Sequence, residues 1–151
     1  MKQFDPAGAL DVDRLVLGVN ESFLMPVGDL SNRPPTYPEA RLADALPRQD
    51  VCLLLAVDEA GRVASAVDVT GRAECGAAGS AEPDFVSAAV QAAKGWRFDP
   101  AVRCVFRTAA AREDAANTGC AGADEIPQAV SLHYRFVFEQ RDGRGAVRLM
   151  Q

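Results

Sequence analysis

The sequence feature that most constrains the fold is a strict alternation in the stretch QAVSLHYRFVFE, residues 128–139. Every second side chain from Val130 to Phe138 is apolar or aromatic, and most of the side chains between them are polar. A period of two places the two sets on opposite faces of a strand. The sequence therefore predicts a half-exposed strand whose apolar face is buried.

A β-hairpin is predicted upstream of this strand. The stretch VCLLLAV, residues 51–57, is nearly all apolar and rich in β-forming residues, which is typical of a strand buried on both faces. The residues DEAG then reverse the chain, and RVASAVDVT returns as an antiparallel strand. The hairpin and the alternating strand together predict a small antiparallel sheet.

A first helix is predicted after the stiff Pro-Pro pair at residues 34–35. Thr36 and Glu39 have the spacing of a capping box, and Pro38 falls in the first turn, where its missing N–H is tolerated. Three turns of helix are expected, ending near Leu46 and Pro47.

A second helix is predicted from Pro83 to Gly95, because apolar side chains from Phe85 to Trp96 recur at helical spacing. Packing both helices on one face of the sheet is the economical arrangement. The expected fold class is therefore α+β, with two helices packed on one face of a small antiparallel sheet. Residues 1–33 are expected to form an irregular arm, and residues 141–151 a loose tail.

Three aromatic side chains are expected to anchor the core: Phe85, Trp96 and Phe98. Trp96, the only tryptophan, ends the helical stripe and begins the extended stretch WRF. We therefore expect its ring to be wedged between the second helix and the sheet rather than exposed for ligand stacking.

The four cysteines permit three complete pairings, and no pairing is required by the count alone. A disulfide between Cys104 and Cys120 is predicted, because the polar, alanine-rich loop between them has no apolar stripe to hold it down. Cys52 lies in the predicted buried strand and is expected to be a free thiol, which leaves Cys75 as the rival partner.

Composition and motifs argue against several function classes. The net charge of −5, with no cluster of Lys or Arg, gives no basis for nucleic-acid binding. Nucleotide-binding and hydrolase motifs are absent, no zinc-site spacing occurs, and His133 lies on the polar face of the alternating strand. We expect no enzymatic activity, no cofactor and no metal.

No apolar run is long enough to span a bilayer, so the chain is expected to be cytoplasmic or a fragment without its export or anchor segment.

Several short motifs occur in a fixed order along residues 33–139. They are P-x-Y-P, V-D-x-x-G-x-V, a Phe near the start of the second helix, W-R-F-x-P-A and a final F-x-F. In this order they resemble the C-terminal domain of the TonB family, periplasmic proteins that couple inner-membrane energy to outer-membrane transporters. The matching residues are Pro35, Tyr37, Pro38, Ala40, Val57, Asp58, Gly61, Val63, Phe85, Trp96, Arg97, Phe98, Pro100, Ala101, Phe136 and Phe138.

The resemblance implies a TonB C-terminal-like domain over residues 34–140, with residues 102–127 as an insertion. It also implies a periplasmic module that binds the TonB box, an extended N-terminal segment of an outer-membrane transporter, in support of energy-dependent transport. Binding would occur by strand addition to an exposed edge, expected at Val130–Phe138. Tyr37 either contacts the peptide or packs over the first helix. The expected peptide-binding residues are Tyr37, Pro38, Val130, Ser131, Leu132, His133, Tyr134, Arg135 and Phe136.

An alternative function is a stand-alone periplasmic or secreted domain that acts as a soluble adaptor, an inhibitor or an assembly factor. The 102–127 insertion favours this alternative, as does the absence from the sequence of an anchor helix and a proline-rich spacer. Its partners would be other proteins of the cell envelope.

Overall fold

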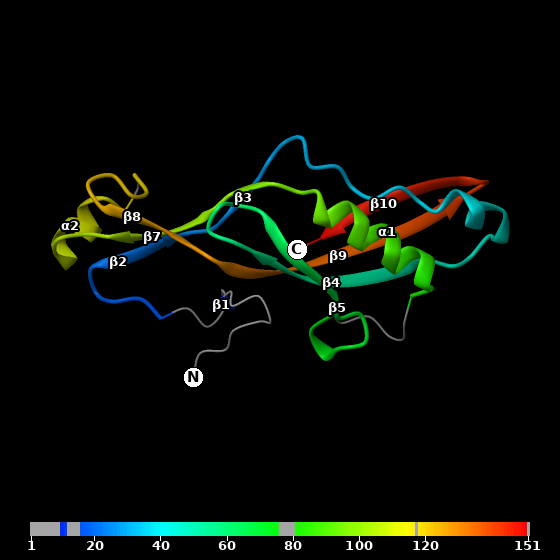
Figure 1. Ribbon diagram of the computed structural model, residues 1–151, viewed down its shortest axis with the longest axis horizontal. Coiled ribbons are helices and arrows are strands. Elements are labelled where there is room, and N and C mark those ends of the chain that lie inside the picture. Colours follow the sequence, from blue (N-terminus) through cyan, green and yellow to red (C-terminus); the bar gives the residue numbers. More distant parts are fainter. Residues whose placement is uncertain (1–9, 12–15, 76–80, 117, 151) are drawn as a thin grey trace. The chain divides into compact units, whose positions relative to one another are not determined.

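The computed structural model describes residues 10–11, 16–75, 81–116 and 118–150, and in these residues the chain is mainly β (Figure 1). The strands form sheets of five, three and two strands. Among the described residues, α1 (Pro83–Lys94) is the one helix of seven or more residues. The strands are β1 (Leu10–Asp11), β2 (Glu21–Leu24), β3 (Val27–Gly28), β4 (Gln49–Val57), β5 (Val63–Asp68), β6 (Phe98–Asp99), β7 (Ala101–Val105), β8 (Asp124–Gln128), β9 (Val130–Arg141) and β10 (Arg144–Met150).

The chain packs as two compact units, each assembled from three separate stretches of sequence. The first unit takes its described residues from 1–30, 56–62 and 97–131. The second unit takes them from 31–55, 63–96 and 132–151. Strands β4 and β9 therefore contribute residues to both units.

The first unit contains the three-stranded sheet, in which β7 pairs antiparallel with β2 and with β8. Cys104 of β7 is fully buried and forms a disulfide with Cys120, which confirms that prediction. Around this disulfide the unit has a small core, which also contains Phe106 and Ala115. The short helix α2 (Ala109–Asp114) lies in the same loop, and the Thr108 hydroxyl caps it by accepting a hydrogen bond from the Ala111 N–H at 3.0 Å.

Shorter pairings complete the first unit. Strands β3 and β6 form an antiparallel ribbon. Strand β1 pairs in parallel with Val130 and Ser131, the two residues that β9 contributes to this unit. The pairing of β1 with β9 joins positions at opposite ends of the sequence.

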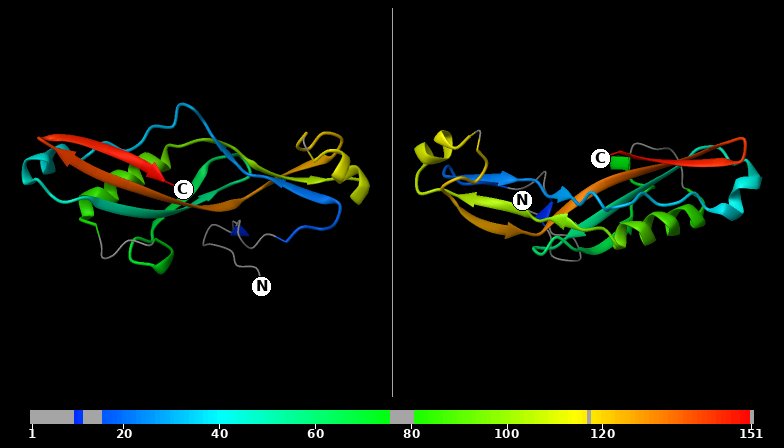
Figure 2. Two further views of the ribbon diagram at one scale, coloured as in Figure 1. Left: turned by 180° about the vertical axis from the view of Figure 1, so that it is seen from behind. Right: turned by 90° about the horizontal axis from the view of Figure 1, so that it is seen from above.

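The second unit is built on strands β5, β4, β9 and β10. Strand β4 lies between β9 and β5, and β10 pairs with β9 (Figures 1 and 2). Side chains at successive positions of β4, such as Leu53 and Cys52, are buried, as predicted for a strand covered on both faces. Helix α1 packs near β5 and buries Phe85, Ala89 and Ala93.

Aromatic rings fill the core of the second unit. The ring of Phe85 contacts Phe138 and Tyr37 edge to face, with centroids 5.2 and 5.1 Å apart. Trp96 is only 4% exposed, and its ring lies 5.3 Å from Tyr134 and 5.7 Å from Phe136 of β9. The predicted burial of Trp96 against the sheet is therefore confirmed.

The predicted fold class is wrong, because the described residues are mostly β and include one helix of seven or more residues instead of two helices packed on one sheet. The stretch expected to form the first helix is η2 (Glu39–Asp44), a six-residue 3₁₀ helix with no buried side chain and no side-chain cap. A short helix without a packed face has little to stabilise it. Ala45 adopts a left-handed conformation and ends the helix.

Segments expected to be irregular instead contain strands. The arm expected at residues 1–33 contains β2 and β3, and the tail expected to be loose contains β10. The expectation of a free Cys52 thiol is also wrong. Cys52 is buried, as predicted for its strand, but it forms a disulfide with Cys75. All four cysteines are thus paired.

Candidate peptide-binding site

The candidate site is the β10 edge of the sheet in the second unit, and a tight hairpin creates it; β5 forms the opposite edge of that sheet. Asp142 and Gly143 connect β9 to β10 and have φ values of 52° and 76°. Positive φ at both central residues is the requirement of a type I′ turn, for which Asp-Gly is a favoured sequence. The turn folds β10 back along β9, with Arg144 opposite Arg141 and Met150 opposite Arg135.

Strand β10 is an edge strand in the part of the chain that the structure describes, because it pairs there with β9 alone. A two-residue turn makes Arg141 and Arg144 a hydrogen-bonded pair, and such pairs alternate along an antiparallel ladder. The backbone N–H and C=O groups of Gly145, Val147 and Leu149 therefore point away from β9. These three residues offer an extended partner a row of donors and acceptors.

Most residues of β10 are exposed, although η2 lies near the strand. Val147 is half-buried, and the other residues of the strand are exposed. Figure 2 shows β10 lying along β9 at the margin of the sheet. No side chain of β10 is buried, so the strand presents both its edge and much of its side-chain surface.

The strand that was expected to be the docking edge, β9, is not an edge. Val130 and Ser131 pair with β1, whereas Arg135 and Phe136 pair with Met150 and Leu149 of β10. The edge expected to be open at Val130–Phe138 is therefore covered at Val130–Ser131 and at Arg135–Phe138. Of the remaining expected contacts, Leu132 is buried, His133 is exposed, and Tyr134 is half-buried beside Trp96.

The sequence contains a signal for the hairpin that forms β10, and the sequence analysis missed it. RDGR, residues 141–144, contains the Asp-Gly pair that favours a two-residue hairpin turn. The residues after it, GAVRLM, are rich enough in apolar side chains to form a strand, although their alternation is weak.

Tyr37, expected either to contact a peptide or to pack in the fold, belongs to the core. Its side chain lies against Phe85 and Phe138, and its hydroxyl is buried with no hydrogen-bond partner among the described residues. Burial raises the pKa of this hydroxyl above its ordinary value. Pro38 beside it is half-buried. Tyr37 therefore contributes to packing and is not positioned to touch a ligand on the surface.

Gly145 lets β10 approach this core. A Cβ atom placed on Gly145 would lie 2.3 Å from the Cβ atom of Tyr37, a distance that no real contact reaches. The face of β10 that includes Gly145, Val147 and Leu149 therefore faces the aromatic core, and the other face carries Arg144 and Arg148.

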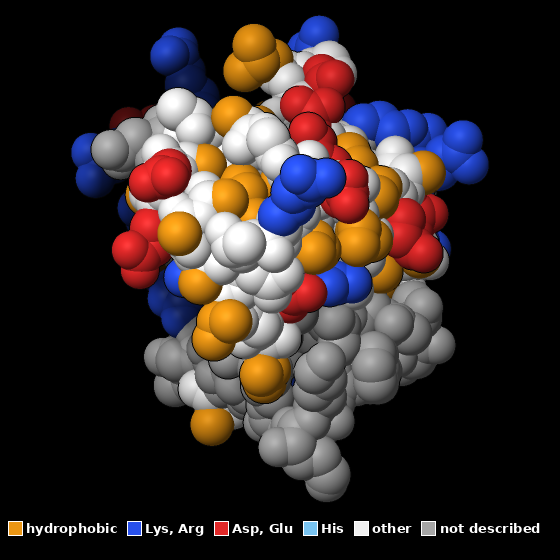
Figure 3. Space-filling view, turned by 90° about the vertical axis from the view of Figure 1, so that its left-hand side faces the viewer, with side chains coloured by type: hydrophobic (Ala, Val, Ile, Leu, Met, Phe, Trp, Pro, Cys, Tyr) orange, Lys and Arg blue, Asp and Glu red, His pale blue; other side chains and the backbone are white. Residues whose placement is uncertain are grey.

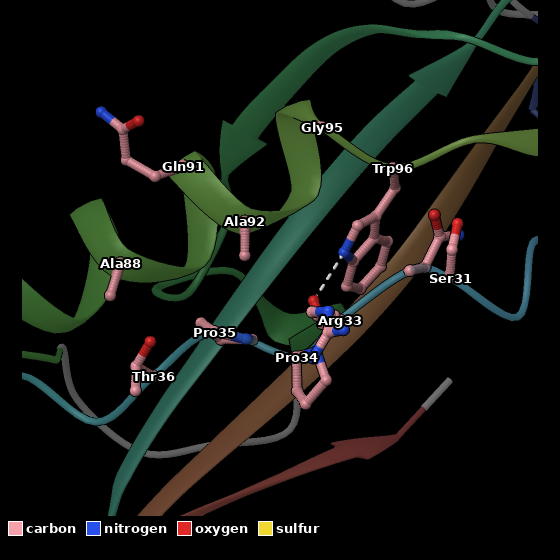
Figure 4. Close-up of a pocket in the computed structure, with 11 residues that line it drawn as sticks. Ser31, Arg33, Pro34, Pro35, Thr36, Ala88, Gln91, Ala92, Gly95 and Trp96 are labelled. Atoms are coloured by element: carbon pink, nitrogen blue, oxygen red, sulfur yellow. Dashed lines mark hydrogen bonds between the residues drawn. The ribbon is translucent and has the colours of Figure 1, made fainter.

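A groove lies between α1 and the extended segment 31–36, with a volume of about 570 Å³. Figure 4 shows Ala88 and Ala92 pointing from α1 toward this segment, while Gln91 points away. Trp96 closes one end, where its Nε1–H donates to the Arg33 carbonyl oxygen at 2.8 Å. Arg33 is the one ionisable residue among the described residues that line this groove, so the groove provides no acid–base pair.

Several large apolar side chains of the first unit are exposed. Leu24, Met25, Val27, Leu30 and Ile126 are all exposed. In the view of Figure 3, apolar side chains are interspersed with acidic, basic and other side chains. Scattered exposed hydrophobic residues are normal on a protein surface and do not by themselves indicate a binding site.

The two disulfides indicate an oxidising, extracytoplasmic environment. Within the described ranges, no helix combines the length and the apolar character that crossing a membrane requires. The same residues include no group of three or more His, Cys, Asp or Glu side chains arranged to hold a metal ion.

Comparison of the chain with protein-family models, with curated proteins and with solved structures found no match.

Proposed function

We propose that this chain is a periplasmic module that captures an extended peptide by strand addition along the outer edge of β10. The observation that carries the proposal is the pairing of β10 with β9 alone among the described residues, over seven consecutive residues. Edge strands of this kind bind extended partners through main-chain hydrogen bonds. The backbone N–H and C=O groups of Gly145, Val147 and Leu149, which point away from β9, supply those bonds.

The source of the peptide in this proposal is an outer-membrane transporter, and the capture serves energy-dependent transport. The ordered motifs around W-R-F-x-P-A, which resemble the TonB family, support this part of the proposal. The disulfides support the periplasm, because it is an oxidising compartment. The hairpin moves the docking strand from β9, where the resemblance had placed it, to β10.

The test is a proline substitution at an outward-facing position of β10. Leu149→Pro removes an N–H that points away from β9, so the hairpin keeps its own ladder while the edge loses a donor. We expect affinity for labelled, proline-free N-terminal peptides of outer-membrane transporters to fall about tenfold, the loss expected for one or two main-chain hydrogen bonds. Fluorescence anisotropy titration measures this affinity.

The matched control is Leu149→Ala, which removes the side chain and retains the N–H. We expect this variant to bind within about threefold of the wild type, since exposed side chains contribute little to main-chain pairing. Circular dichroism and thermal melting establish that both variants are folded. Unchanged or tighter binding by a folded Leu149→Pro variant would show that peptides do not add to this edge.

A further inference from the structure

Arginine side chains gather on one face of the sheet in the second unit. Cross-strand partners in an antiparallel pair lie on the same face. The register therefore places Arg135, Glu139, Arg141, Arg144 and Arg148 together, since the partners are Arg141 with Arg144, Glu139 with Ala146, and Arg135 with Met150. We call this set, with Arg48 and Asp50, the arginine face.

The ion pairs connect Asp50 to the same face. Its carboxylate lies 2.6 Å from Arg48 Nε and 3.9 Å from Arg135 Nε. The hydrogen bond from Arg48 lowers the pKa of Asp50, burial opposes that effect, and the positive charges of Arg135 and Arg148 lower the pKa further. The arginine face thus contains five arginines and two carboxylates, Asp50 and Glu139, with Asp142 in the adjoining turn. It is a basic surface on a chain whose net charge is −5.

The two arginines of β10 are placed to meet a partner. Arg148 Nε lies 3.0 Å from Glu139, and both side chains are about half exposed. Arg144 stands directly opposite Arg141, and neither has an ion-pair partner within the part of the chain that the structure describes. Like charges directly opposite each other on neighbouring strands are unfavourable. A carboxylate on the next strand outward would relieve this repulsion.

The other face of β10 has a different character. Val147 and Leu149 lie there beside Phe138 and Phe136, their partners in β9. A strand added outside β10 would place its side chains alternately beside the arginines and beside these apolar residues. The edge therefore favours a strand whose side chains alternate: acidic ones beside the arginines, and apolar ones beside Val147 and Leu149.

We infer that the peptide captured at β10 is acidic, with carboxylates at two positions four residues apart beside Arg144 and Arg148. Apolar side chains flank each of these positions. The inference rests on the proposed function, because it assigns the class of peptide that the same edge selects. Individually exposed ion pairs are weak, so the charges select among peptides that the main chain already holds.

The test compares three labelled peptides that differ only at the two charged positions: TVDVTVDVT, TVNVTVNVT and TVKVTVKVT. In 20 mM NaCl we expect the Asp peptide to bind about fivefold more tightly than the Asn peptide, and the Lys peptide to bind most weakly. The advantage of the Asp peptide should shrink in 0.5 M NaCl, because salt screens exposed charges.

A charge-reversed protein sharpens the comparison. The double variant Arg144→Glu with Arg148→Glu should prefer the Lys peptide over the Asp peptide. The control double variant, Arg107→Glu with Arg112→Glu, changes the net charge equally through exposed residues of the first unit and should keep the wild-type order.

The outcomes separate the inference from the proposed function. Equal binding of the Asp and Asn peptides, together with loss of both on Leu149→Pro, overturns the inference and leaves strand addition standing. Binding of no peptide by the folded wild type overturns both. Arginine-dependent binding of phosphatidylglycerol vesicles, without peptide binding, overturns both and assigns the arginine face to an anionic lipid surface.

Discussion

The two units stabilise their interiors in different ways. The first unit has a small core in which Cys104, Phe106, Ala115 and Cys120 surround a disulfide. The core of the second unit contains the packed rings of Phe85, Phe138 and Trp96, although it also contains the Cys52–Cys75 disulfide. The first unit therefore depends on a covalent link where the second depends on the burial of aromatic area.

From this comparison we expect the importance of each disulfide to depend on its surroundings. The two disulfides close loops of similar size, with sequence separations of 16 and 23 residues. In the chain-entropy model both loops give about 3 kcal/mol, so loop length does not distinguish them. What differs is the packing that remains after each bond is removed.

The largest effect is expected from truncating an aromatic ring of the second unit. Phe85 is fully buried, and Phe85→Ala should lower the free energy of unfolding by about 3–5 kcal/mol because it leaves a cavity among rings. Urea unfolding followed by Trp96 fluorescence measures the loss in that unit. Leu30→Ala, at an exposed position, is the control. A loss below about 1 kcal/mol would mean that the aromatic rings do not carry this core.

Removing the Cys104–Cys120 disulfide is expected to have the next largest effect. Changing both residues to Ala should cost the first unit about 3 kcal/mol. Hydrogen exchange should accelerate across residues 106–116, while the Trp96 unfolding midpoint stays within error of the wild type.

The corresponding Cys52→Ala and Cys75→Ala double variant provides the comparison for this result. It should shift the Trp96 midpoint and leave exchange at residues 106–116 unchanged. Equal acceleration at those residues in both double variants would contradict separate stabilisation of the two units.

A smaller effect is expected at the contact between β10 and the aromatic core. Gly145→Ala places a methyl group against Tyr37, and overpacking of this kind costs about 1–3 kcal/mol. Exchange at the amides of residues 144–150 should accelerate more than exchange in β4. Gly71→Ala is the control, because a Cβ atom there has no heavy atom within 4 Å among the described residues. Similar protection of β10 in both variants would contradict close packing on Tyr37.

Local sequence signals predicted several features of the structure correctly. The apolar run at residues 51–57 lies within β4, and the helical spacing from Phe85 corresponds to α1. The Cys104–Cys120 disulfide was predicted because its loop has no apolar stripe. In each case the information lies within one short segment.

Pairing between distant segments could not be predicted in the same way. Strand β8, with the sequence DEIPQ, has exposed acidic residues and a proline, and it becomes a strand because β7 pairs with it. The first helix was predicted from Thr36 and Glu39, but no side chain of the stretch Glu39–Asp44 is buried in the structure. The candidate edge was misplaced because one turn, at Asp142 and Gly143, was overlooked.

The interleaving of the two units in the sequence also sets the order in which the molecule can be completed. Strand β4 ends at Val57, whereas its neighbour β9 begins at Val130, after β7 and β8 of the first unit. Both disulfide loops are complete in the chain before β9 has been synthesised. Pairing between distant segments is slow, so the apolar side chains of β4 stay uncovered until β9 pairs with it. During this time the thiols of Cys52 and Cys75 can already react. We therefore expect the Cys52–Cys75 disulfide to form before the sheet closes, and a cysteine mispaired at that stage to delay the pairing of β4 with β9.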